Sequence, residues 1–235
     1  MKHLKYLHIV FSVIFLSHLY ALITENELLR YATKPLIVLS LVGFMAFLNQ
    51  LFGKFRKRIL VGLLFALFGD VFLMFDGDNS LYFMLGLTSF LLCHIFYIQA
   101  FNLDMKSAPH RKNKYFLPAS IVLAIFCGGF FMYLRPNLGT LQIPVLFYCF
   151  ILTLMVMLSI GRWGKVESYG ARLMTIGALL FLMSDGVLAY NKFVMSFENS
   201  SVLVMSTYML AQYFIVLGTI NRVLATKDSI TEVST

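Results

Sequence analysis

Residues 64–73 read LFALFGDVFL and residues 179–188 read LLFLMSDGVL, and these two stretches decide how the chain folds. Each belongs to a long apolar run that an aspartate interrupts, Asp70 in the first run and Asp185 in the second. An aspartate at the centre of a membrane-spanning helix costs about 2.5–3.5 kcal/mol on insertion scales. Ionisable groups at that depth usually face the interior of the bundle, where they handle protons or ions or take part in catalysis. The pair therefore predicts an internal functional site in a membrane protein.

The composition agrees with a membrane fold. The 235 residues are 60% hydrophobic and 13% charged, and the mean hydropathy is +0.82. A soluble domain of this size is about 45–50% apolar and about a quarter charged. The net charge of +8 does not indicate nucleic-acid binding, because the basic residues lie in short loops between apolar runs. We therefore expect a multi-pass membrane protein that binds no nucleic acid.

Eight apolar runs are long enough to cross a bilayer, which requires about 20 residues per helix. The expected fold is all-α, with one transmembrane domain over residues 1–221 and a disordered cytoplasmic tail over residues 222–235. The first run is interpreted as a retained span, because no small-residue cleavage site follows it. The eight expected spans are approximately 5–23, 35–52, 59–75, 80–101, 115–134, 141–160, 171–190 and 201–221.

Lysine and arginine predict which helix ends face the cytoplasm. The N-terminus, the loops at 53–58, 102–114 and 161–172 and the C-terminal tail together hold fifteen of these residues. The alternate loops hold four. Because basic residues concentrate on the cytoplasmic side of membrane proteins, both termini are predicted to be cytoplasmic. In a bacterium the protein would lie in the inner membrane.

The two aspartates occupy matching places in the two halves of the chain. They are 115 residues apart, and each lies five residues before the end of an expected outward-running span. At 1.5 Å per residue both would lie about 8 Å below the outer boundary and could face each other across a shared cavity. The same arithmetic places His94 about 12 Å deeper, out of reach of both carboxyl groups. The pattern also suits two parallel four-helix repeats, although few residues around the aspartates are identical.

Several short motifs follow one another along the spans. They are Lys34-Pro35-Leu36, Leu67-Phe68-Gly69-Asp70-Val71, Gly86 through His94 to Tyr97, residues 177–185 (GALLFLMSD), Asn191-Lys192-Phe193 and Tyr208-Met209-Leu210-Ala211-Gln212. In their order and spacing they resemble the YhhN-like family of membrane proteins, which includes the lysoplasmalogenases. The resemblance covers nearly all of the spans. Gly186-Val187 departs from the family pattern, in which bulkier or polar residues are common at this place.

The resemblance implies hydrolysis of the vinyl ether bond of a lysoplasmalogen, which gives a fatty aldehyde and a glycerophospho head group. Asp70 and Asp185 match the two intramembrane aspartates regarded as essential in the family and would be the catalytic residues. The substrate would be a lysophospholipid in the bilayer, and no cofactor or metal would be needed. We expect a cavity between the third, fourth, seventh and eighth spans. The candidate substrate-binding residues are His94, Tyr97, Gly86, Tyr208, Gln212, Asn191 and Lys192.

The chemistry of this reaction suits two buried carboxyl groups. Protonation of the β-carbon of a vinyl ether gives an oxocarbenium ion, which water captures as a hemiacetal that collapses to aldehyde and alcohol. The slow step needs an acid that is still protonated near neutral pH and a negative or basic partner. Burial disfavours the charged form of a carboxyl group, and two neighbouring carboxyl groups titrate as a pair. The sequence leaves open which aspartate is the acid and which is the base.

Other interpretations of the same residues also remain open. Tyr208 and Gln212 share a helix face, so hydrogen bonding between helices would explain them without a substrate. Lys192 lies near the outer end of its expected span, where lysine side chains commonly extend toward the membrane surface without any ligand. The alternative functions are a proton-coupled secondary transporter or lipid carrier, and a non-catalytic lipid-binding protein. No Gly-x-Ser-x-Gly elbow or His-Glu-x-x-His motif occurs, which argues against a serine lipase and a zinc hydrolase of those types.

Overall fold

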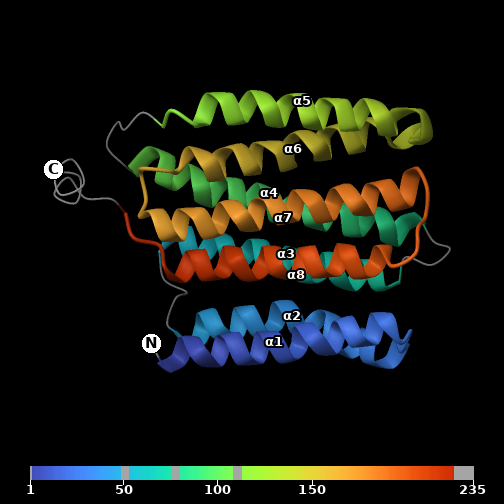
Figure 1. Ribbon diagram of the computed structural model, residues 1–235, viewed down its shortest axis with the longest axis horizontal. Coiled ribbons are helices and arrows are strands. Elements are labelled where there is room, and N and C mark those ends of the chain that lie inside the picture. Colours follow the sequence, from blue (N-terminus) through green and yellow to red (C-terminus); the bar gives the residue numbers. More distant parts are fainter. Residues whose placement is uncertain (1, 49–52, 76–79, 108–112, 225–235) are drawn as a thin grey trace.

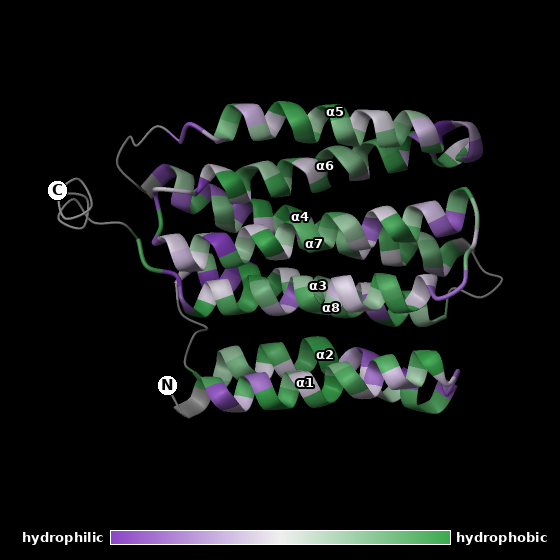
Figure 2. Ribbon diagram, viewed as in Figure 1, coloured by the Kyte–Doolittle hydropathy of each residue, from purple (hydrophilic) through white to green (hydrophobic). Residues whose placement is uncertain are grey.

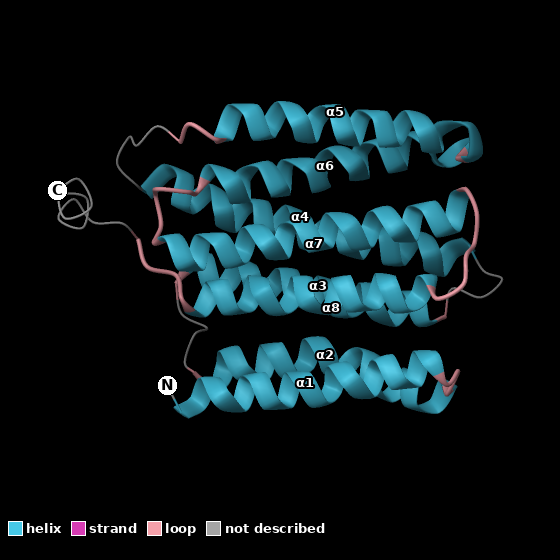
Figure 3. Ribbon diagram, viewed as in Figure 1, coloured by secondary structure: helices cyan, strands magenta, loops and turns pink. Residues whose placement is uncertain are grey.

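The computed structural model describes residues 2–48, 53–75, 80–107 and 113–224. These residues form eight α-helices, two short 3₁₀ turns and two isolated β-bridges, without an extended strand (Figure 3). The all-α prediction is therefore confirmed. The helices are α1 (Lys2–Ile23), α2 (Glu27–Phe47), α3 (Lys54–Met74), α4 (Ser80–Ser107), α5 (Phe116–Leu134), α6 (Gln142–Gly161), α7 (Ser168–Phe193) and α8 (Ser200–Ile220), and the 3₁₀ turns are η1 (Arg135–Asn137) and η2 (Gly139–Leu141).

The helices run side by side, with the hairpin of α1 and α2 at one edge of the bundle and α5 at the other (Figure 1). Between them, α3 packs on α4, α4 on α6, α6 on α7, α7 on α8 and α8 back on α3. These five helices thus form a closed ring of contacts around a shared interior. The start of α1 and the end of α8 lie at the same end of the bundle, as an even number of spans requires.

Hydrophobic residues extend along the helices, and many of them face outward (Figure 2). Leu16, Ile125 and Ile143 are each more than 60% exposed, which suits contact with lipid tails. Within the described residues, seven helices are long and apolar enough to cross a membrane. The remaining helix, α3, has the same length as α2, 21 residues, but carries a basic cluster at its start and Asp70 near its end. The chain is a multi-pass membrane protein.

Helix α2 begins earlier than predicted, at Glu27 rather than near Pro35. The sequence interpretation placed Pro35 at the first turn, where the missing N–H costs nothing. In the structure the side chain of Asn26 instead caps the helix and accepts a hydrogen bond of 3.0 Å from the N–H of Leu29. The proline therefore lies inside the helix. This change moves Arg30 and Lys34 from the expected outer loop into α2.

The aspartate-bearing helices approach their returning helices closely at equivalent glycines. Gly62 and Gly177 each lie eight residues before the aspartate of their half. A Cβ atom on Gly177 would lie 2.8 Å from the carbonyl oxygen of Ala211, and one on Gly62 would lie 3.2 Å from that of Cys93. Only glycine allows backbones to pack at these distances. The two close contacts hold α3 against α4 and α7 against α8.

The contact between Tyr97 on α4 and Gln212 on α8 also relates the two halves. The hydroxyl of Tyr97 donates a 2.7 Å hydrogen bond to Oε1 of Gln212, and both side chains are buried. The two residues are 115 apart in the chain, the same offset as between the two aspartates. Equivalent positions of two repeats meet each other only near their common axis. The bond therefore supports the predicted pair of four-helix repeats.

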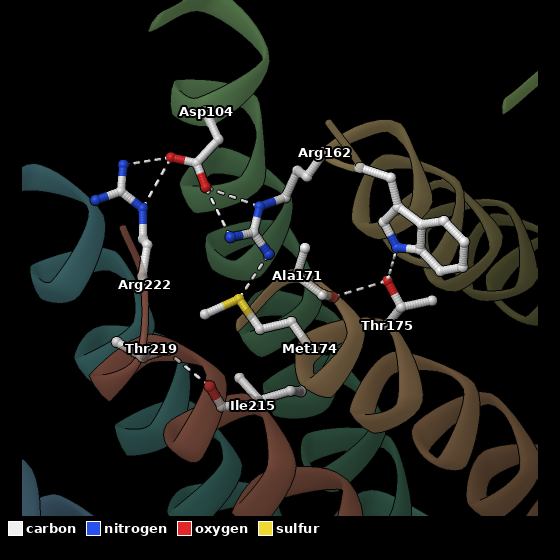
Figure 4. A network of polar contacts seen from close by, with 9 residues as sticks. Asp104, Arg162, Ala171, Met174, Thr175, Ile215, Thr219 and Arg222 are labelled. Atoms are coloured by element: carbon white, nitrogen blue, oxygen red, sulfur yellow. Dashed lines mark hydrogen bonds and ion pairs between the residues drawn. The ribbon is translucent and has the colours of Figure 1, made fainter. Parts of the chain in front are cut away.

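A buried ionic cluster lies at the end of the bundle where α1 begins and α8 ends (Figure 4). The carboxylate of Asp104 on α4 accepts hydrogen bonds from Nε of Arg162 at 2.7 Å and from the guanidinium of Arg222. Asp104 and Arg162 have no exposed surface. The guanidinium of Arg162 also lies 4.9 Å from the ring of Phe101. The cluster joins α4 to the α6–α7 loop and to the segment after α8.

The segment after α8 continues these contacts as far as Leu224. The N–H of Glu167 donates to the carbonyl of Val223, and Val166 forms an isolated antiparallel bridge with Leu224. The expected tail over residues 222–235 thus overlaps three residues that pack on the bundle. Its remaining residues, 225–235, lie outside the described part of the chain.

We expect the end of the bundle that carries the ionic cluster to face the cytoplasm, because fifteen of nineteen basic residues lie in the segments expected there. Reporter fusions at the N-terminus, at the C-terminus and in the loop between α4 and α5 should report the cytoplasm. A fusion in the loop between α7 and α8 should report the outer side. An outer location for the α4–α5 loop would reverse the orientation.

Candidate active site

Asp185 lies on α7 and is held from two other helices. Its Oδ2 accepts a 2.5 Å hydrogen bond from the hydroxyl of Tyr148 on α6. Nε2 of His94 on α4 lies 3.7 Å from the same oxygen. The His94 side chain is fully buried, whereas that of Asp185 is 11% exposed. Asp185 is therefore buried where it meets His94 and Tyr148, and a small part of its side chain remains accessible.

The prediction that His94 lies too deep to reach an aspartate is wrong. Helix α7 continues to Phe193, eight residues beyond Asp185, whereas the apolar run was expected to end five residues beyond it. Asp185 is therefore about 12 Å from the end of its helix, whereas Asp70 is only about 6 Å from the end of α3 at Met74. The apolar run ends before the helix does, because Asn191 and Lys192 continue the helix beyond it. Because helix ends need not lie level with one another, the distance to a helix end does not give the depth of an aspartate, and Nε2 of His94 reaches Oδ2 of Asp185.

Asp70 is almost completely buried on α3, with 1% of its surface exposed. Its Oδ2 accepts a 2.7 Å hydrogen bond from the hydroxyl of Tyr208 on α8. Each aspartate thus contacts the returning helix of the other half, Asp70 through Tyr208 and Asp185 through His94. Because of these contacts with the opposite half, both carboxyl groups face the interior of the helix ring.

Aromatic rings fill the centre between the two aspartates. The ring of Phe181 stands edge-on to that of His94 at 4.6 Å and to that of Tyr208 at 5.5 Å between centroids. Phe90 packs edge-on against both Phe181 and Tyr208. The predicted cavity between α3, α4, α7 and α8 is nevertheless present beside this layer, because residues of all four helices line the polar cavity described below. The structure also contains an apolar cavity on α7.

The first cavity is apolar and has a volume of about 680 Å³. Side chains of α4, α5, α6 and α7 line it, among them Leu87, Phe130 and Leu152. Gly186 also lines it, and a Cβ atom there would meet only the ring of Phe130 at 4.0 Å. A slot of this size and character suits a hydrocarbon chain.

The second cavity is polar and has a volume of about 380 Å³. It is lined by Asp70 and its neighbours at the end of α3, by Phe90 of α4, by the α1–α2 hairpin, by the end of α7 and by the start of α8. Asp185 and Leu188 line this cavity as well as the apolar one. The two cavities therefore meet at Asp185, one on each side of its helix.

The other predicted binding residues have different places. Asn191 lines the polar cavity, as does Tyr208, which holds Asp70. Lys192 lines neither of these two cavities, and its ammonium group lies 4.6 Å from the ring centroid of Phe83. The expectation that Gly86 leaves room for substrate is wrong, because a Cβ atom there would lie 2.7 Å from the side chain of Leu73 on α3.

Tyr97 and Gln212 are hydrogen-bonded to each other and line neither cavity. Sequence reasoning missed Tyr148, since a tyrosine in an apolar span has no pattern that distinguishes it from a packing residue. It also missed His18, which lies in the first span and lines the polar cavity. Arg30 was counted only as a topology signal, and Lys34 only as that and as part of a family motif, although both line the same cavity.

A sequence profile of the YhhN family matches residues 29–219, which include both aspartates, the whole lining of the apolar cavity and the lining of the polar cavity apart from His18 and Leu22. The chain belongs to the YhhN family. The match covers α3 to α7 and nearly all of α2 and α8, and it therefore includes the five helices of the ring. The predicted family resemblance is confirmed.

The YhhN chain is similar to several curated proteins. It is 31% identical over 167 residues to lysoplasmalogenase TMEM86A of Bos taurus, which covers 69% of this chain and 65% of that protein. It is 27% identical over 203 residues to lysoplasmalogenase TMEM86B of Homo sapiens, with 83% and 78% covered. A lysoplasmalogenase of Mycobacterium bovis is 28% identical over 203 residues, with 83% and 72% covered. The chain thus spans slightly less than two thirds of the bovine relative's length, and no solved structure matches it.

Proposed function

We propose that this protein hydrolyses the vinyl ether bond of lysoplasmalogens to a fatty aldehyde and a glycerophospho head group. The observation that carries the proposal is the place of Asp185 at the junction of an apolar and a polar cavity. A lysoplasmalogen has one hydrocarbon chain and one polar head, and its vinyl ether lies between them. A substrate with its chain in the apolar cavity and its head in the polar cavity places the reactive bond at Asp185. The curated names of the relatives support the same reaction.

The two aspartates take different roles in this mechanism. Asp185 lines the apolar cavity, next to the β-carbon on the chain side of the ether oxygen. Its carboxyl proton transfers to that carbon, and the resulting oxocarbenium ion faces the polar cavity, which both carboxylates line. Asp70 lines only the polar cavity, where water has access. Its carboxylate takes a proton from the water whose oxygen bonds to the α-carbon.

The hemiacetal then collapses, and each aspartate recovers its starting protonation state. Its hydroxyl proton goes to the carboxylate of Asp185, and the proton held by Asp70 goes to the departing glycerol oxygen as the carbon–oxygen bond breaks. Both aspartates regain their starting states, and the net change is addition of one water. The hydroxyls of Tyr148 and Tyr208 position the two carboxyl groups throughout.

The direct test is aldehyde release by the purified full-length chain in detergent. We expect release from a 1-alkenyl lysophospholipid and none from the saturated 1-alkyl analogue, which lacks the carbon that accepts the proton. Absence of aldehyde from the alkenyl lipid, together with lipid transfer between leaflets of proteoliposomes, would favour the carrier instead.

Gly186→Leu is expected to shorten the chain that the enzyme accepts. The new side chain would enter the apolar cavity, since a Cβ atom at this position meets no closer neighbour than Phe130 at 4.0 Å. Excluding two methylene groups from the cavity corresponds to a loss of about tenfold in kcat/KM, at about 0.8 kcal/mol per group.

The measurement compares kcat/KM for 16-carbon and 8-carbon alkenyl chains in the wild type, Gly186→Leu and Gly186→Ala. The loss should be confined to the long chain and should be smaller in Gly186→Ala. Equal loss for both chain lengths would show that the hydrocarbon chain lies elsewhere.

A further inference from the structure

The polar cavity contains three basic side chains that the hydrolysis does not use. His18 lies near the end of α1, and Arg30 and Lys34 lie in the first turns of α2. All three come from the hairpin at the edge of the bundle, outside the ring of five helices (Figure 1). Basic groups inside a membrane protein are costly, so a cluster of them in one cavity points to a ligand of opposite charge.

We propose that His18, Arg30 and Lys34 form a subsite for the glycerophosphate part of a lysolipid, in which the two cations bind the phosphate oxygens. The identity of the lipid rests on the proposed function, whereas the subsite itself does not require the reaction. Arginine and lysine both bind phosphate through charge-assisted hydrogen bonds, and the arginine fork can bind two oxygens at once.

Arg30 and Lys34 are placed to act on one group. They are four residues apart on α2 and therefore share a helix face. Arg30 lies about 5 Å and Lys34 about 10 Å from the start of the helix at its outer end. This range is the depth of lipid head groups and the outermost hydrocarbon. A phosphate at the mouth of the cavity would lie between the two cations.

Arg30 is able to turn toward a ligand. Its side chain is 42% exposed, and its ion pair with Glu27 spans 3.7 Å at the surface. An exposed ion pair of this kind contributes little to stability. Lys34 and Asp70 line the same cavity, so Lys34 also connects the subsite to the reacting pair.

His18 offers an acceptor rather than a third cation. The hydroxyl of Thr33 donates its proton to the carbonyl of Leu29 at 2.6 Å and therefore accepts the 2.8 Å hydrogen bond from Nδ1–H of His18. Neutral His18 then carries a lone pair on Nε2, which has no partner among the described residues and is buried. The free sn-2 hydroxyl of a lysolipid is a donor of the kind that this nitrogen lacks.

The test measures binding of uncleavable lipids by calorimetry on the full chain in detergent. The wild type should bind 1-O-hexadecyl-glycero-3-phosphocholine about tenfold or more tightly than 1-O-hexadecylglycerol, which lacks the phosphate. Arg30→Gln and Lys34→Gln should each reduce this preference by about tenfold, and Arg135→Gln, an exposed arginine of η1 at the same end, should not. The 2-O-methyl analogue should bind more weakly than the free 2-hydroxyl lipid in the wild type, and this difference should disappear in His18→Phe.

Preference for the phosphate lipid that survives in both Gln variants, with normal elution in size-exclusion chromatography, would overturn the subsite and leave Lys34 only as a lining residue of the cavity that it shares with Asp70. Glycerophosphocholine that binds as tightly as the whole lipid would instead identify a site for soluble phosphodiesters. Normal aldehyde release without a phosphate preference would refute the subsite alone. A clear phosphate preference without aldehyde release would refute the proposed hydrolysis and retain the subsite.

Discussion

Asp185→Asn is expected to abolish aldehyde release while the protein inserts and folds normally. Asparagine has nearly the shape of aspartate, but its amide cannot transfer a proton to carbon. A positioned general acid contributes about 10²–10⁴-fold to a rate, and the loss should be at least that large. Stability should hold, because a neutral amide replaces a neutral carboxyl group of nearly the same shape. The measurements are kcat by aldehyde release and Tm by fluorescence-detected size-exclusion.

Asp70→Asn should be comparably inactive, since water would lack its base. Members of one catalytic unit are strongly non-additive, so the double variant should be about as inactive as either single variant. Tyr148→Phe and Tyr208→Phe are the graded controls, because each removes one hydrogen bond to a carboxylate and keeps the ring. They should retain partial activity. Substantial turnover by either Asn variant at normal protein levels would remove the two-carboxylate mechanism.

Asp104→Asn should produce the largest loss of stability. Its carboxylate is shared by Arg162 and Arg222, and both Asp104 and Arg162 are without exposed surface. Removing one partner of a buried ion pair typically costs about 3–5 kcal/mol, since the other charge is left buried without compensation. For a chain of this length that corresponds to a decrease in Tm of about 10 °C. Hydrolysis measured well below the lowered Tm should be retained, because the cluster is at the opposite end of the bundle from the polar cavity.

Arg222→Gln is the matched control. Arg222 is 17% exposed, and its removal leaves Arg162 still paired with Asp104. Its Tm should therefore decrease by clearly less than that of Asp104→Asn. Equal Tm values for Asp104→Asn and the wild type would show that the cluster does not stabilise the bundle.

Features that belong to one continuous segment could be predicted from the sequence. Apolar runs of about 20 residues predict membrane helices because the bilayer satisfies no backbone hydrogen bonds. The same reasoning identified Asp70 and Asp185, since a carboxyl group within such a run is conspicuous whatever surrounds it. The order of short motifs was enough to predict the YhhN family, which the profile match over residues 29–219 confirmed.

The tertiary structure alone decided which groups meet these two aspartates. Tyr148 and His94 reach Asp185 from other helices, and Tyr208 reaches Asp70 across the two halves of the chain. Depth counted from the ends of apolar runs placed His94 too far away, because a hydrophobic run fixes the length of a helix and leaves its shift and tilt to packing. The cavities likewise arise between helices that are distant in sequence, and the polar one borders an aromatic layer that no single segment specifies. The rotation of each helix about its axis decides which side chains face that layer, and it is set by close packing against neighbouring helices.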